Sequence, residues 1–216
     1  MRCAQPVFGC YCEHIQRINS KIKFVILIHP IEAKRRIATG RMSHLCLENS
    51  ELIRGQNYTN NGRVNRILAD PSHQPFVLYP GRTSMDLSEA TEEQKASLFS
   101  ANRTPVVFVI DGTWATARKM VRQSLNINSI PRICFTPANR SRFLVRKQPR
   151  PDCYSTIEAI HQTIELLGSS VGFDISERKQ DSLLCVFNKM VERQLSLMRD
   201  SIANPRATSY RRQRIS

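Results

Sequence analysis

The chain has 216 residues, of which 41% are hydrophobic and 23% charged, and its formal net charge is +14. This length suits one domain with small appendages, and this composition can build a hydrophobic core, so a wholly disordered chain is excluded. No apolar run approaches the roughly 20 residues of a membrane span, and the N-terminus lacks a secretory signal, so we expect a cytoplasmic protein without membrane association.

Short β-rich runs alternate with helical runs, which is typical of an α/β protein with a mostly parallel sheet flanked by helices. In chain order, the pattern predicts a strand at 23–28, a helix or helical turn at 31–41, a strand at 51–54, a helix at 62–69, a strand at 76–79, a helix at 88–99, a strand at 106–110, a helix at 114–123, a strand at 132–136, and helices at 155–167 and 177–199. The buried stripe expected on the last helix is Leu184, Phe187, Val191, Leu195 and Met198.

The chain accordingly divides into three parts. An N-terminal cysteine-containing segment (1–16) precedes the main domain (20–200), and a basic tail (204–216) that we expect to be flexible follows it. The seven cysteines are an odd number, which argues against a disulfide framework in a cytoplasmic protein. Cys46, Cys134 and Cys185 lie within apolar patterns and are predicted to be small core residues.

The excess of positive charge points to a polyanionic partner. Arginines far outnumber lysines, and arginine favours bidentate phosphate contacts and base stacking. A domain this basic gains affinity for nucleic acid by releasing counterions, so we predict nucleic acid as the partner rather than a merely soluble basic protein. The expected RNA-contacting residues are Lys34, Arg35, Arg36, Arg41, Arg140, Arg142 and Arg150, together with the arginine-containing tail.

The ligand site is expected beyond the carboxyl ends of the strands, where open parallel sheets bind their ligands. The chain has neither a G-x-G-x-x-G fingerprint after a strand nor a P-loop motif, so other loops must hold the ligand. The most informative of these is the segment 111–114 (DGTW). A carboxylate directly after a buried strand is partly desolvated, so the pKa of Asp111 should rise. From spacing alone, Asp111 or Thr113 caps the next helix and Trp114, the only tryptophan, packs.

The segment 111–114 also resembles the signature of the DTW-domain family of tRNA-uridine aminocarboxypropyltransferases. Three further blocks are similar to the family's motifs in order and spacing: 29–32 (HPIE) with 39–41 (TGR), 79–81 (YPG), and 146–149 (RKQP) with 155–159 (STIEA). The matches together span about residues 3–160. No single block decides the matter, but four blocks in the right order are a specific signal.

This resemblance implies a SPOUT-like α/β fold with a trefoil knot in its C-terminal half. It implies that S-adenosylmethionine is the donor and that its 3-amino-3-carboxypropyl group moves to N3 of a tRNA uridine, leaving methylthioadenosine. Two alternatives stay open, RNA methylation on the same fold and a non-catalytic RNA-binding protein. The sequence leaves the oligomeric state open between a monomer and a homodimer.

The resemblance also suggests roles for individual residues. Asp111 is the candidate catalytic residue, because attack by uridine N3 requires removal of a proton; alternatively, it orients the base or the donor's amino group. Arg146 or Lys147 pairs with the donor's carboxylate or holds a tRNA phosphate. The full set of expected donor-binding residues is Leu78, Tyr79, Pro80, Gly81, Asp111, Gly112, Thr113, Trp114, Arg146, Lys147, Ser155 and Thr156.

Several of these residues also have purely structural interpretations. Ser155 and Glu158 have the spacing of a capping box, so we expect Glu158 to be structural. His29 is expected to be a buried, hydrogen-bonded histidine rather than a catalytic one. Glu32 is expected to anchor one of the three nearby arginines, Arg35, Arg36 or Arg41.

Three N-terminal cysteines suggest a zinc site. The spacing of Cys3, Cys10 and Cys12 resembles the last three cysteines of the C-x2-C-x6-C-x-C site of many relatives, whose first cysteine would fall before Met1. Three thiolates leave a tetrahedral zinc ion one ligand short. Either His14 supplies the fourth ligand, or a residue before Met1 does, or no metal binds.

Overall fold

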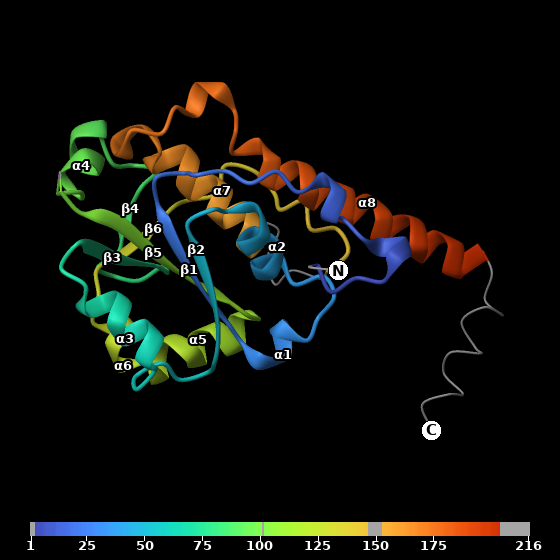
Figure 1. The fold of residues 1–216 in the computed structure, drawn as a ribbon, viewed down its shortest axis with the longest axis horizontal. Coiled ribbons are helices and arrows are strands. Elements are labelled where there is room, and N and C mark those ends of the chain that lie inside the picture. The colour runs from blue at the N-terminus through green and yellow to red at the C-terminus, as the bar shows by residue number, and fades with distance from the viewer. Residues whose placement is uncertain (1–2, 101, 147–152, 204–216) are drawn as a thin grey trace.

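A computed structural model describes residues 3–100, 102–146 and 153–203 (Figure 1). Its centre is a six-stranded sheet of order β2-β1-β5-β3-β6-β4, in which every neighbouring pair is parallel. The strands are β1 (Lys23–Ile28), β2 (Ser50–Arg54), β3 (His73–Leu78), β4 (Met85–Asp86), β5 (Thr104–Asp111) and β6 (Arg132–Cys134). The predicted α/β class and mostly parallel sheet are therefore confirmed.

Helices cover both faces of this sheet (Figure 1). One face carries α2 (Thr39–Cys46), α7 (Thr156–Leu167) and α8 (Asp181–Ala203), and the other carries α3 (Gly62–Ala69), α5 (Trp114–Gln123) and α6 (Leu125–Asn128). Two short helices, α1 (Pro30–Ala33) and α4 (Glu92–Ser97), and four 3-10 turns, Val7–Gly9, Cys12–His14, Ser169–Val171 and Ile175–Glu177, complete the described elements. No helix in these ranges has the length and apolarity to cross a membrane.

The central strands are apolar on both faces because each face builds its own core. Phe24 and Ile26 of β1 pack with the α2, α7 and α8 side chains, whereas Val25 and Leu27 pack against the α3, α5 and α6 side. This alternation follows from the two-residue repeat of a strand. It explains why β1 and β5 appear in the sequence as continuous apolar runs.

The helix predicted at 31–41 is wrong, because the segment forms two short helices with a break between them. His29 caps α1, since its Nδ1 accepts a hydrogen bond from the backbone N–H of Ile31, and Pro30 takes the first helical position. The guanidinium of Arg41, in α2, donates to the backbone carbonyls of Ala33 and Arg35. Arg41 thus stabilises the non-helical residues between α1 and α2.

The helix predicted at 88–99 is shorter than expected. Thr91 is its N-cap and forms a reciprocal capping box with Gln94, so the helix begins after Thr91. Ser88 instead lies outside it, and its hydroxyl bonds the backbone of Thr136, beyond β6. The helix therefore begins four residues later than expected.

The last helix starts at Asp181, four residues later than predicted, and its buried stripe differs. The buried side chains are Leu183, Val186, Phe187, Met190 and Val191. Met198 is 52% exposed and Cys185 is exposed, which corrects both core predictions. The distal half of α8 runs beyond α7 (Figure 1), so fewer elements cover it. Cys134 is only half-buried, whereas Cys46 is buried as predicted.

Candidate active site

A cavity of about 600 Å³ lies at the carboxyl ends of β3, β5 and β6. Its volume falls in the range of small-molecule sites, and its wall is mostly apolar with a few polar groups. Ten of the twelve predicted donor-binding residues line it: Leu78, Tyr79, Pro80, Asp111, Gly112, Thr113, Trp114, Arg146, Ser155 and Thr156. Three loops far apart in the sequence therefore meet at one cavity.

The two other predicted donor-binding residues are Gly81 and Lys147. Lys147 lies outside the described residues. Gly81 is not part of the cavity wall; a Cβ there would lie 2.8 Å from a guanidinium nitrogen of Arg132. That guanidinium lies 5.6 Å from the centre of the Tyr79 ring, in a cation–π contact. The absence of a side chain at Gly81 thus makes room for Arg132.

Much of the apolar wall consists of residues that were not predicted from the sequence. Phe135, Phe143 and Tyr154 line the cavity, and all three come from the irregular stretch between β6 and α7. The rings of Phe135 and Tyr154 lie 5.8 Å apart. This stretch has no helical or strand periodicity. Its cluster of aromatic residues was therefore the sequence feature that could have indicated a cavity wall.

Asp111 is a buried carboxylate with one unsatisfied oxygen. It is the last residue of β5 and is only 3% exposed. Its Oδ1 accepts a hydrogen bond of 2.7 Å from the hydroxyl of Thr156, at the start of α7. Its Oδ2 has no hydrogen-bond partner among the described residues. Burial raises the pKa of Asp111 to about 6.

The surroundings of Asp111 modify this pKa in both directions. The hydrogen bond from Thr156 lowers it, the nearby charge of Glu32 raises it, and Arg146 and the backbone of Gly40 lower it. A Cβ at Gly40 would collide with Oδ2 of Asp111 and lie 2.8 Å from its carboxyl carbon, so Oδ2 is packed against the start of α2. Glycine at the start of α2 therefore allows the close approach of backbone to carboxylate.

The structure decides between the two capping candidates of the 111–114 segment and corrects the expectation that Trp114 packs. Thr113, not Asp111, caps α5, because its hydroxyl accepts a hydrogen bond from the backbone N–H of Thr116. Trp114 is 41% exposed and lies at the edge of the cavity, so it is not a packed core residue. Asp111 therefore does not cap the helix, and Trp114 is not held in the core.

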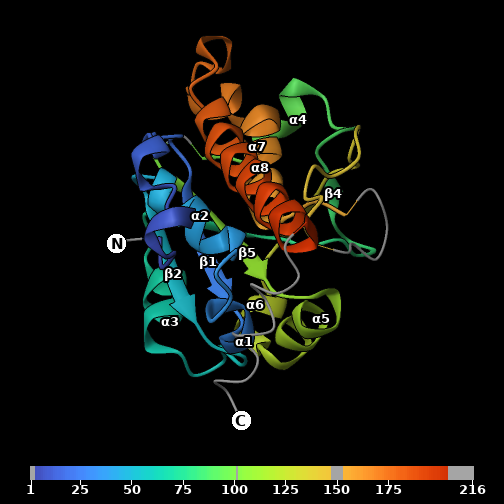
Figure 2. The same cartoon turned by 90° about the vertical axis from the view of Figure 1, so that its right-hand side faces the viewer.

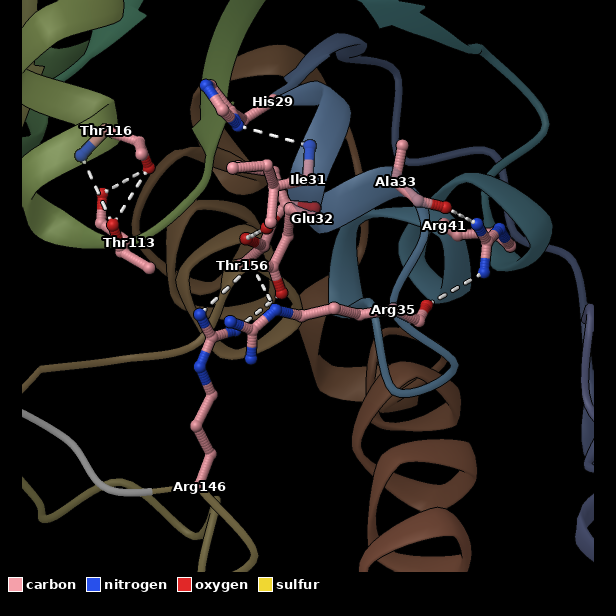
Figure 3. A network of polar contacts seen from close by, with 11 residues as sticks. His29, Ile31, Glu32, Ala33, Arg35, Arg41, Thr113, Thr116, Arg146 and Thr156 are labelled. Atoms are coloured by element: carbon pink, nitrogen blue, oxygen red, sulfur yellow. Dashed lines mark hydrogen bonds and ion pairs between the residues drawn. The ribbon is translucent and has the colours of Figure 1, made fainter. Parts of the chain in front are cut away.

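Glu32 and Arg146 form a bidentate ion pair at the cavity wall (Figure 3). The two hydrogen bonds measure 2.6 and 3.0 Å, and Glu32 is only 2% exposed. Glu32 also lies 3.4 Å from Arg35, one of the three predicted partners, but its closer partner is Arg146. A buried carboxylate of this kind needs a well-formed partner, because an unpaired buried charge costs several kcal/mol.

The predicted RNA-contacting residues fall into three groups. Lys34, Arg35, Arg36, Arg140 and Arg142 are exposed, as such contacts require. Arg41 is half-buried, and its guanidinium donates to backbone carbonyls between α1 and α2, so its RNA contact stays a prediction. Arg150 and the tail at 204–216 lie outside the described residues.

Glu158 has the structural role that was predicted for it. Its carboxylate accepts hydrogen bonds from the backbone N–H and the hydroxyl of Ser155, at 2.8 and 2.6 Å. It also accepts from the hydroxyl of Ser141 and from the backbone N–H of Arg142, at 2.8 and 2.7 Å. Glu158 thereby ties the segment between β6 and α7 that contains Arg140, Arg142 and Arg146, here called the arginine-rich loop, to the start of α7.

The N-terminal cysteines converge but do not complete a zinc site. The sulfurs of Cys3, Cys10 and Cys12 lie within 4.8 Å of one another, and those of Cys3 and Cys10 are 3.7 Å apart. His14 does not join this group; its ring lies 3.4 Å from Glu13. The described residues therefore bring together three thiols and no fourth ligand.

Comparisons with known proteins agree with one another. A family model described as "DTW domain" matches residues 1–195. A tRNA-uridine aminocarboxypropyltransferase 2 of Drosophila melanogaster is 32% identical over 177 residues, which cover 78% of this chain and 66% of that protein. Proteins of the same name from Mus musculus and Macaca fascicularis are 22% and 20% identical, covering 92% and 93% of this chain and 66% and 67% of theirs. The chain thus spans about 66% of the length of the first relatives. No solved structure matches it.

Proposed function

This chain belongs to the DTW-domain family, and on that premise we propose that it transfers the 3-amino-3-carboxypropyl group of S-adenosylmethionine to N3 of a tRNA uridine. One observation carries the proposal: Asp111, a buried carboxylate with a raised pKa, is one of ten residues expected to bind the donor that line a single cavity. The names of the curated relatives support the same activity, and the net charge of +14 suits a tRNA substrate.

The cavity fits a donor of this class. Its volume of about 600 Å³ is suitable for a nucleoside with an amino-acid arm, and the apolar wall is suitable for the adenine and the methylthio group. We assign the adenosine side to the loop of Tyr79 and Pro80. The amino-acid arm is assigned to the side of Asp111 and Arg146, where the polar groups are concentrated.

In the proposed reaction, Asp111 acts as the general base. The N3–H of uridine has a pKa well above neutrality, so the proton must be removed as N3 attacks. The proton moves to the carboxylate of Asp111, which lines the cavity. N3 forms a bond to the γ-carbon of the donor while the bond from that carbon to sulfur breaks, and the electron pair leaves with methylthioadenosine. With a pKa of about 6, Asp111 is mostly ionised at pH 7 and is a stronger base than an ordinary aspartate.

The choice of the propyl carbon over the methyl group requires that the donor's amino-acid arm be held in line with the acceptor. We assign this positioning to Arg146, which lines the cavity while paired with Glu32. Glu32 holds the guanidinium in place from the side of α1 (Figure 3). A carboxylate on the donor would then bind a guanidinium that is already oriented.

Incubation of the purified chain with tRNA and S-adenosylmethionine tests the proposal. Mass spectrometry should find methylthioadenosine and a uridine heavier by one aminocarboxypropyl group. Adenosylhomocysteine with a methylated nucleoside would mean methyl transfer instead. Binding of tRNA without either product would mean a non-catalytic RNA-binding protein.

Three further expectations remain part of the proposal. The parallel sheet with a ligand cavity at its carboxyl edge is compatible with a SPOUT-like fold, and tracing the chain in an experimental structure would test for the C-terminal trefoil knot. Cell fractionation would test the cytoplasmic location. Light scattering would decide between a monomer and a homodimer.

We further propose that the three N-terminal cysteines bind zinc with a fourth ligand from elsewhere. Cys3, Cys10 and Cys12 supply three soft ligands, and the fourth position would be taken by water or by a residue outside the described ranges. Native mass spectrometry after zinc addition tests this. Retention of one zinc ion, lost on Cys10→Ser substitution, supports the site, whereas an unchanged apo mass removes zinc from the account.

A further inference from the structure

Helix α5 carries an exposed stripe of one aromatic and two cationic side chains that begins at the cavity. Trp114, Arg118 and Arg122 recur every four residues and therefore lie on one face of the helix. All three are exposed, whereas Ala117, Met120 and Val121 face the core. We call Trp114, Arg118 and Arg122 the α5 stripe. Lys119 lies beside it and is also exposed.

The charges of this stripe are not compensated. None of Arg118, Lys119 and Arg122 forms an ion pair among the described residues. The sequence has no acidic residue anywhere between Asp111 and Asp152, a stretch that contains α5, α6 and the arginine-rich loop. Two segments of purely positive charge therefore flank the cavity, and only one of them was predicted as a binding surface.

We propose that the α5 stripe binds the RNA strand that carries the acceptor uridine. Trp114 provides a flat aromatic surface at the cavity edge, on which an unstacked base can lie. Helix α5 itself lies next to the carboxyl end of β5 (Figure 2). Arg118 and Arg122 follow Trp114 on the same exposed face of α5. They contact the phosphates that follow the base. This inference rests on the proposed function for the identity of the partner.

A salt titration tests the cationic part of the stripe. The probe is a short RNA hairpin with a uridine-containing loop, added without donor, and binding is followed by quenching of Trp114, the only tryptophan. The variant is Arg118→Gln with Arg122→Gln. The matched control is Arg17→Gln with Arg103→Gln, two exposed arginines that precede β1 and β5 at the opposite edge of the sheet.

Loss of two phosphate contacts to single-stranded RNA should lower the slope of log affinity against log salt by about 1.4. The control has the same net charge and should keep the wild-type slope. Equal slopes in the two double variants would overturn the proposal. Thermal unfolding of each variant verifies that the fold is retained.

A second pair of measurements tests Trp114. Trp114→Ala should weaken hairpin binding about tenfold, measured with a labelled RNA, and Trp114→Phe should restore most of the loss because it keeps an aromatic face. A fully paired RNA duplex should not quench Trp114, since it offers no unstacked base. Wild-type affinity in Trp114→Ala, or equal quenching by duplex and hairpin, would overturn the stacking role.

Failure of this inference is distinguishable from failure of the proposed function. The titrations contain no donor, so quenching with the predicted salt slope supports the α5 stripe even if no group is transferred. Conversely, transfer to tRNA with an unchanged slope in Arg118→Gln with Arg122→Gln would leave the function intact and remove the stripe.

Discussion

Two buried carboxylates, one at the end of β5 and one in the first turn of α7, have opposite surroundings. Glu158 accepts four hydrogen bonds, and its carboxylate joins the arginine-rich loop to α7. Asp111 accepts one side-chain hydrogen bond, from Thr156, and its other oxygen has no partner in the described part of the chain. A carboxylate with four hydrogen bonds stabilises the fold, whereas one at a cavity with a single side-chain hydrogen bond and a raised pKa can take a substrate proton.

The largest expected effect is on activity at Asp111. Asp111→Asn keeps the shape of the side chain but cannot take a proton, so the rate of transfer should fall by about 100- to 10,000-fold. Single-turnover assays with tRNA measure this rate, and thermal unfolding verifies the fold. A variant with more than about a tenth of wild-type activity would remove Asp111 as the base.

At Glu158 the largest effect should be on stability. Glu158→Ala leaves the hydrogen-bond donors around Ser155 and Arg142 without their acceptor, so the free energy of unfolding should fall by about 3 kcal/mol. Urea unfolding measures this change. Glu192→Ala, an exposed glutamate on α8, is the control and should change it by less than about 0.5 kcal/mol. If Glu158→Ala lowered the free energy of unfolding only slightly but greatly reduced activity, the structural role of Glu158 would be contradicted.

The raised pKa of Asp111 should appear in the stability of the protein. A carboxyl with a folded pKa near 6 and an ordinary unfolded value stabilises the fold below about pH 4, and this contribution is lost as pH rises to 6. The loss amounts to about 3 kcal/mol from this group. The difference in unfolding free energy between wild type and Asp111→Asn should therefore change by that amount between pH 4 and 7. No change in the difference would mean that Asp111 has an ordinary pKa.

The smallest expected effect is at Thr156. Its hydroxyl bonds the ionised form of Asp111, so Thr156→Val should raise the pKa of Asp111 further, by about one pH unit. The midpoint of the pH–activity profile should move upward accordingly. Thr163→Val is the matched control, because that hydroxyl bonds the carbonyl of Ala159 within the same helix. An upward shift in both variants would indicate a general effect on α7.

The sequence predicted those parts of the fold that local patterns determine. β1, α3 and α5 were correct to the residue, because an apolar run or a one-sided helical pattern defines each of them. β4 was missed because a two-residue strand leaves no pattern. The break between α1 and α2 was missed because side-chain contacts of Arg41 with backbone carbonyls six and eight residues earlier maintain it, and such contacts leave no periodic pattern.

For the site, the sequence predicted the loops but not their pairings. Glu32 and Arg146 are 114 residues apart, and only the three-dimensional arrangement brings them together. The position of Glu32, an acid among cations directly after a strand, suggested a partner without identifying which one. The surroundings of Asp111 were likewise beyond prediction, because Gly40 of α2 and Thr156 of α7 reach its carboxylate only in the folded chain.

The pH dependence of single-turnover aminocarboxypropyl transfer by the wild-type chain tests the central claim most directly. The account predicts a rate that rises about tenfold per pH unit at low pH, has its midpoint near pH 6, and is level above pH 7. A rate independent of pH between 5 and 8, with methylthioadenosine still released, would contradict the assignment of Asp111 as the base.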